Sequence, residues 1–104
     1  MHYVILASHN AEVCPTSNAK TKALLLGVAP QIADFAAKHG VRMVAGPFAN
    51  REHMVVVIVE TDRSEALDTF LVETRLSQWN TVRILPSLPM EESMRELEEG
   101  SSLF

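Results

Sequence analysis

The chain has 104 residues, of which 47% are hydrophobic and 21% charged, and this composition indicates a globular protein and excludes a disordered one. The formal net charge is −4, and the nine basic residues form no cluster, which argues against a nucleic-acid partner. No stretch approaches the roughly 20 apolar residues of a membrane span, so no membrane partner is expected. We expect one domain over residues 1–104.

Cysteine content and the start of the chain indicate where the protein resides. The single cysteine, Cys14, cannot form an intramolecular disulfide, and this is typical of a reducing compartment. The first apolar run is short and lacks the basic segment that precedes it in a signal peptide. We therefore expect a cytoplasmic protein.

Apolar runs rich in β-branched residues predict four strands. In chain order they cover residues 3–7, 41–46, 53–61 and 82–85. The Gly46-Pro47 pair should end the second strand, and Pro86 should begin a turn after the fourth.

Helical periodicity appears in three places. Apolar residues recur at three and four over residues 18–39, with Asn18 or Ser17 as a candidate N-cap, and Pro30 should interrupt this helix near Gly27. A second helix should begin at a capping box, with Asp62 as N-cap and Glu65 three residues later, and run to about residue 76. A short terminal helix should carry an apolar stripe of Met90, Met94 and Leu97.

The resulting order, β-α-β-β-α-β with a C-terminal helix, is the α+β pattern of the ferredoxin-like fold. Its four-stranded antiparallel sheet has the order 4-1-3-2, which places the first and third strands in the centre. The pattern agrees, because these two strands are apolar on both faces, whereas the second and fourth carry Arg42 and Arg83, as edge strands tolerate.

Apolar residues on both faces of the central strands have a consequence for assembly. Two helices cover only one face of a four-stranded sheet, and a large exposed apolar face is a liability. We therefore expect a homodimer through the second sheet face. Leu103 and Phe104 end the chain with apolar groups that would dock on a neighbour in a higher homo-oligomer.

Topology brings polar residues from distant segments to one end of the sheet. The end of the first strand lies beside the start of the antiparallel third strand, so His9, Cys14 and His53 should meet there. We interpret these three as candidate catalytic residues. The substrate-binding candidates at the same end are Asn18, Arg51 and Trp79, and Asn50 and Asn80 lie there too. His2 and His39 map to the opposite end.

Two alternatives stay open for these three residues. Imidazole and thiolate suit a transition metal, so His9, Cys14 and His53 could be ligands instead of catalysts, although the histidines could equally serve as local hydrogen-bond partners. Cys14 could be a reactive thiol with a lowered pKa, or it could be a buried small hydrophobe. The sequence requires no cofactor.

Three segments, together with the order of the elements, resemble the dimeric α/β-barrel superfamily of ferredoxin-like proteins. These segments are His2–Leu6, Val44–Pro47 and Trp79–Pro86. The superfamily includes small quinone-forming monooxygenases, muconolactone isomerases and YCII-related proteins. The resemblance implies a dimer with pockets beside the sheet, and it carries over no activity residue by residue.

We therefore expect a small cytoplasmic enzyme, or enzyme-like protein, that acts on a small organic molecule at the sheet end bearing His9, Cys14 and His53. One histidine would serve as general base. A non-catalytic module that binds a metal or small ligand is the alternative. A structural oligomerisation domain is the third reading.

Overall fold

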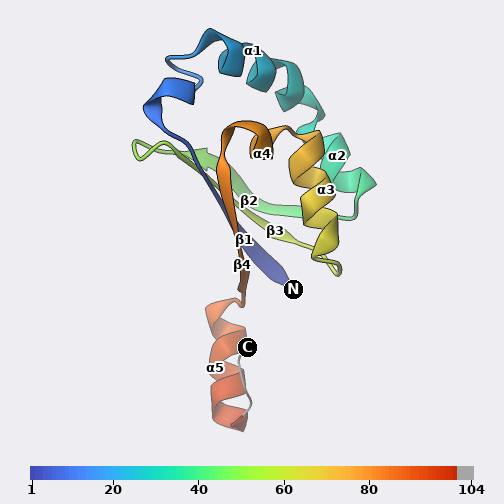
Figure 1. Cartoon of the computed structure of the whole chain (residues 1–104). Coiled ribbons are helices and arrows are strands. Elements are labelled where there is room, and N and C mark those ends of the chain that lie inside the picture. The colour runs from blue at the N-terminus through green and yellow to red at the C-terminus, as the bar shows by residue number, and fades with distance from the viewer. Residues whose placement is uncertain (101–104) are drawn as a thin grey trace.

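The computed structural model describes residues 1–100, so the expected docking of Leu103 and Phe104 lies outside the described residues. The main elements are β1 (His2–Ser8), α1 (Ala19–Val28), α2 (Ile32–Lys38), β2 (Arg42–Ala49), β3 (Met54–Glu60), α3 (Glu65–Glu73), α4 (Leu76–Trp79), β4 (Thr81–Ser87) and α5 (Met90–Glu99). Two 3₁₀ turns, η1 (Ala11–Val13) and η2 (Ala29–Gln31), flank α1. Figure 1 shows the arrangement of these elements.

The four strands form one antiparallel sheet in the order β2-β3-β1-β4, which is the predicted order 4-1-3-2 read from the other edge. In the register of the central pair, Ile5 lies opposite Val57 and Ser8 lies opposite Met54. This α+β arrangement is compatible with a ferredoxin-like fold. The prediction of fold class and strand order is confirmed.

The hydrophobic core lies between one face of the sheet and the helices α2, α3 and α4. Alternate residues of the central strands, such as Ile5, Val57 and Val59, are buried on this inner face. Phe70 of α3 and Leu76 of α4 pack against them in the same cluster. Because alternation in a strand sends every second side chain to the other face, the core uses only half of the apolar strand residues.

The other half forms a second, outer sheet face. Val4 lies opposite Ile58 and Leu6 lies opposite Val56, and all four side chains stay half-exposed in residues 1–100. Leu85 of β4 pairs with Val4 on the same face. The single chain therefore leaves apolar side chains on this face partly in contact with water.

The predicted interruption of the long helix is confirmed. Helix α1 ends at Val28, a 3₁₀ turn contains Pro30, and α2 begins at Ile32. The side-chain amide of Gln31 donates a hydrogen bond of 3.2 Å to the carbonyl oxygen of Gly27. Proline lacks the amide donor of a regular helix, so the break falls where the missing hydrogen bond would have been.

The predicted ends of both edge strands were wrong. Strand β2 continues through Gly46-Pro47 to Ala49, and β4 includes Pro86. Two register shifts interrupt the β2–β3 pairing on either side of Ala45. Gly46 has a φ of 85°, and a Cβ there would lie 2.7 Å from the carbonyl oxygen of Val56. Edge strands accept proline at such irregular positions because one side of the strand needs no partner.

The predicted capping box of the second helix was also wrong. Helix α3 begins at Glu65 after Ser64, and no side-chain hydrogen bond caps it. The hydroxyl of Thr61, rather than Asp62, accepts a hydrogen bond of 3.3 Å from the backbone NH of Arg63. The helix ends at Glu73 instead of residue 76 because Arg75 takes a left-handed conformation, with a φ of 64°.

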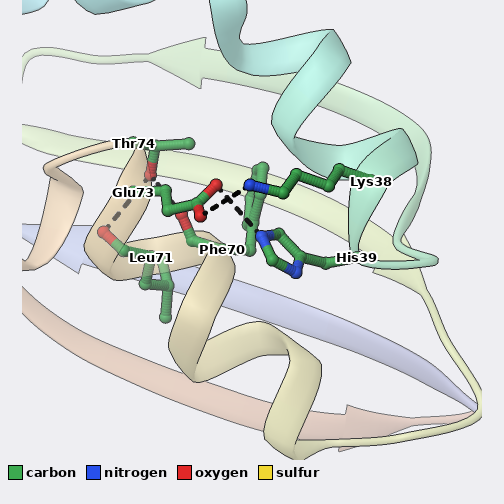
Figure 2. Close-up of polar contacts among 6 residues, drawn as sticks. All are labelled: Lys38, His39, Phe70, Leu71, Glu73 and Thr74. Carbon is green, nitrogen blue, oxygen red and sulfur yellow. Dashed lines mark hydrogen bonds and ion pairs between the residues drawn. The ribbon is translucent and has the colours of Figure 1, made fainter.

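Two polar contacts fix the end of α3 against the end of α2, as Figure 2 shows. The Nε2 atom of His39 lies 3.0 Å from one carboxylate oxygen of Glu73, and the Lys38 ammonium donates a hydrogen bond of 3.4 Å to the other. The buried hydroxyl of Thr74 donates to the carbonyl oxygen of Phe70 at 2.9 Å. His39 thus has a structural partner, far from the predicted site.

Helix α5 extends from the end of β4 away from the other helices (Figure 1). Its predicted apolar stripe exists, but the side chains of Met90, Met94 and Leu97 are exposed within residues 1–100. Within the described residues, no helix combines the length and the apolar character that a membrane crossing requires.

The Glu73 contacts generate a pH prediction. The His39 imidazole, and then the Lys38 ammonium, hold the pKa of the Glu73 carboxyl below its ordinary value. A carboxyl with a depressed folded-state pKa stabilises the fold above its unfolded pKa of about 4.3, and this contribution disappears as the pH falls through the folded value. Glu73→Gln should therefore lower the free energy of unfolding more at pH 6 than at pH 3. Denaturant titrations at both pH values measure this difference.

The exposed residue Glu98 of α5 offers the matched control. Glu98→Gln should leave the free energy of unfolding unchanged at both pH values. An equal loss of stability for Glu73→Gln at pH 6 and pH 3 would contradict the electrostatic origin of the contribution.

Candidate functional site

The register of the central strands places two histidines side by side. His9 follows β1 directly and His53 precedes β3, and the backbone NH of His9 donates a hydrogen bond of 3.0 Å to the carbonyl oxygen of His53. The two imidazole ring centroids are 5.6 Å apart. His53 has a φ of 55°, in the left-handed region, which costs about 1–3 kcal/mol for a residue with a side chain. The predicted juxtaposition is confirmed.

A chain of local hydrogen bonds holds Cys14 in position. The side-chain oxygen of Asn10 accepts hydrogen bonds from the backbone NH groups of Glu12 and Val13 and so caps the turn η1. The carbonyl oxygen of Cys14 accepts two hydrogen bonds of 2.9 Å, from the NH groups of Ser17 and Asn18. Two successive capped turns thus fix the loop from both sides of the cysteine.

Cys14 is only 7% exposed, yet it lies outside the hydrophobic core cluster. Its sulfur is 3.0 Å from the Thr16 hydroxyl oxygen. The Thr16 hydrogen bonds, and then those of His9 and His53, lower the pKa of the Cys14 thiol to about 6. Donors favour the thiolate over the thiol, and here they outweigh the opposing effect of burial. Cys14 is therefore buried without having the environment of a core side chain.

The ligand atoms of His9, Cys14 and His53 all lie within 4.8 Å of one another. All three residues line a cavity of about 270 Å³ at the end of the sheet. Trp79 forms part of the same wall, and its indole ring centroid is 4.9 Å from that of the His9 imidazole. The structure therefore brings four of the six predicted site residues together at one cavity.

Asn80 determines which nitrogen of His9 carries the proton. The NH₂ group of the Asn80 side-chain amide donates a hydrogen bond of 3.0 Å to the carbonyl oxygen of Leu76. This contact orients the side-chain oxygen of Asn80 toward Nδ1 of His9, 2.9 Å away. An amide oxygen only accepts, so Nδ1 must be the donor. Neutral His9 then has its lone pair on Nε2, the nitrogen that a base or a metal ligand uses, and this nitrogen donates to the Cys14 thiolate once it has taken up a proton.

The other two predicted site residues lie elsewhere. The Asn18 side chain accepts a hydrogen bond of 3.0 Å from the NH of Thr21 and donates one of 3.0 Å to the carbonyl oxygen of Glu12, so it acts as the predicted N-cap of α1. It lines a separate cavity. Arg51 is exposed in the turn between β2 and β3 and does not line the cavity of Cys14.

Sequence reasoning assigned no role in the site chemistry to two residues that contact it. Thr16 is two positions from the cysteine, and its side chain is the strongest partner of the thiol. Asn80 was placed at the correct edge, but the residue it contacts, His9, is 71 positions away. Only three-dimensional structure reveals such a contact.

No protein-family model matches this chain, and no curated protein matches it. The α+β architecture and the order of the strands are compatible with a ferredoxin-like fold, and neither comparison supports membership of the dimeric α/β-barrel superfamily.

The Thr16 contact predicts the effect of a conservative substitution. Thr16→Val removes the hydroxyl but keeps the size of the side chain, so it should raise the pKa of the Cys14 thiol from about 6 toward its ordinary value. Thr16→Ser keeps the hydroxyl and is the control. The thiolate absorbance near 240 nm, followed against pH, measures the pKa in each protein. Identical values for the valine and serine variants would contradict the role of the hydroxyl.

Proposed function

We propose that this protein is an enzyme that acts on a small organic molecule by nucleophilic catalysis, with Cys14 as the nucleophile. The observation that supports this most directly is the position of the thiol. Its sulfur contacts Thr16 and lies near two imidazoles in the wall of a cavity. A nucleophile beside a base that a third group orients is the general pattern of covalent catalysis. A reactive free thiol also fits a cytoplasmic location.

In this proposal His9 is the base and Asn80 orients it. The thiol proton passes to Nε2 of His9, and the thiolate attacks an electrophilic carbon of the substrate. The bond-forming electron pair comes from sulfur, and the displaced pair moves to the substrate, which then takes the proton back from the His9 imidazolium. The 2.9 Å contact with Asn80 keeps Nδ1 protonated and the ring fixed during this exchange.

His53 completes the site from the opposite strand. The ring of His53 meets that of His9 edge to face, with an angle of 71° between the planes. One ring nitrogen of His53 lies within 4.8 Å of both the Cys14 sulfur and a ring nitrogen of His9. An imidazole at this place would donate a hydrogen bond to a substrate oxygen that gains negative charge. Trp79 would cover one side of the bound molecule.

A metal site is the second candidate function, supported by the grouping of two imidazoles and one thiol within 4.8 Å. Catalytic zinc sites use three such ligands and leave a fourth position open, and their ligand atoms lie only about 3.3–3.6 Å apart, given metal–ligand bonds of about 2.0–2.3 Å. The side chains would therefore need to draw together on binding. The thiol reading needs only one such approach, that of the Cys14 sulfur to the His9 imidazole, so we favour it.

A thiol-labelling experiment separates these functions. In the native protein Cys14 should react with iodoacetamide at a rate that reaches half its maximum near pH 6, because the pKa of the thiol is lowered to about this value. His9→Ala should raise that midpoint, and Asn80→Ala should slow the reaction at pH 7 with a smaller shift. Stopped-flow labelling, with mass spectrometry to identify Cys14, measures both.

His39→Ala is the matched control, since that histidine lies at the other end of the sheet and should leave labelling unchanged. Labelling that requires denaturation would contradict the nucleophile. Stoichiometric zinc, copper or iron in freshly purified protein, lost in Cys14→Ala, would instead support the metal site.

We further propose that the active form is a homodimer in which the outer sheet faces of two chains pack together. The resemblance to dimeric α/β barrels implies this arrangement. The half-exposed side chains Val4, Leu6, Val56 and Ile58 form a continuous apolar surface across the two central strands. An identical sheet would cover this surface with a face of equal shape and character, as in aligned sheet packing.

Val56→Glu should convert the dimer into a monomer, because a carboxylate would be buried at the centre of the interface. Sedimentation velocity at low micromolar concentration measures the change. Val72→Glu introduces the same side chain at an exposed position of α3, and it should remain dimeric. A monomeric wild-type protein under these conditions would contradict the proposal.

A further inference from the structure

An apolar cavity of about 170 Å³ lies between the helices and the sheet. Residues of α1, α2, β2, β3, α3 and α4 form its wall, and the lining side chains are all hydrophobic. They include Leu25, Ile32, Met43, Ala49, Val55 and Trp79. Because none of these side chains carries a charge, the cavity offers little to hold water or an ion.

This apolar cavity adjoins the cavity that contains Cys14. Four residues line both: Leu25, Ala49, Val55 and Trp79. Each cavity alone is smaller than the roughly 300–1,000 Å³ typical of ligand sites, whereas a molecule that enters both would reach this range. The cavity of the reactive group and the apolar chamber thus have these four wall residues in common.

The break between α1 and α2 accounts for the space. Thr21 is the only buried residue of α1, so this helix does not pack its apolar side chains closely on the sheet. Leu25 is half-buried and reaches the common wall, and α2 resumes the packing at Ile32 and Ala36. The wall of the chamber therefore includes Leu25 of α1 and Ile32 of α2, one residue from each side of the break.

We infer that the substrate is an elongated molecule with an electrophilic carbon at one end and a hydrocarbon body at the other. The electrophilic end would lie at Cys14, and the body would fill the apolar cavity past Trp79. This inference rests on the proposed nucleophilic function and adds the class of substrate. A hydrocarbon group is the occupant that a chamber without charged side chains favours, because it needs no hydrogen-bond partner.

A conjugated carbonyl compound shows how the chemistry balances. The Cys14 sulfur forms a bond to the β-carbon, the alkene electron pair moves to the carbonyl oxygen as an enolate, and the α-carbon takes the proton that His9 removed from the thiol. No oxidant, reductant or other reactant is needed, and the reverse elimination, in which His9 takes a proton from the α-carbon and the S–C bond breaks, releases the carbon skeleton and frees the thiolate. The hydrocarbon body takes no part in the bond changes and contributes binding alone.

A series of N-alkylmaleimides, from methyl to hexyl, tests the inference with conjugated carbonyl probes. The second-order rate constant for Cys14, divided by that for glutathione, should rise with chain length by up to about fourfold for each methylene, the factor that corresponds to burying one methylene group. The rise should stop when the chamber is full.

Two variants locate the effect in the apolar cavity. Met43→Phe combined with Ile32→Phe fills the chamber and should flatten the series. Val44→Phe, at the exposed neighbouring position of β2, should keep the full rise. Circular dichroism confirms that each variant is folded.

A binding measurement without the thiol separates the two proposals. Trp79 is the only tryptophan and lines both cavities, so its fluorescence in Cys14→Ala should respond to 1-hexanol and not to ethanol. Rapid labelling with a flat series and no Trp79 response would overturn the substrate class and leave the nucleophile. A Trp79 response with an unreactive Cys14 would overturn the nucleophile and support the apolar chamber as a binding site.

Discussion

The antiparallel pairing of β1 with β3 is the constraint on which the site depends. Its register places Ser8 opposite Met54, and the hydrogen bond from the His9 amide to the His53 carbonyl continues the pairing one step beyond the strands. A slip of one residue would send the inner-face side chains of one strand to the outer face. Burial of Ile5 and Val57 opposes such a slip, so the same apolar contacts that form the core also align the two imidazoles.

The loop that carries Cys14 is fixed by backbone capping rather than by burial of apolar groups. Asn10 caps the turn before the cysteine and Asn18 caps the helix after it. Because these caps use the side-chain oxygens of both asparagines, those oxygens are not free to contact a ligand. The thiol is left with Thr16 as its nearest donor, and this contact has the largest effect on its pKa.

The helix layer and the site are linked through the segment that ends α4. Leu76 is buried in the core and also accepts the hydrogen bond that orients Asn80, which in turn holds His9. Trp79, between them, contacts the His9 ring and lines both cavities. Packing of a core helix thereby sets the tautomer of a histidine at the sheet end, which couples the stability of the fold to the chemistry of the site.

Much of the fold follows from the sequence because its causes are local. Alternation and β-branched runs determine the strands, the missing amide of Pro30 breaks the helix, and the strand order follows from which strands are apolar on both faces. The meeting of His9 with His53 was predictable for the same reason, since antiparallel topology alone requires it.

Tertiary structure decided the rest. The extension of β2 past Pro47 depends on pairing at an irregular edge, and the left-handed Arg75 ends α3 without a glycine to signal it. The contact of Asn80 with His9 joins residues 71 positions apart, and the apolar cavity exists only because α1 stands off the sheet. Neither feature has a local pattern, because each is set by the packing of segments that are distant in the chain.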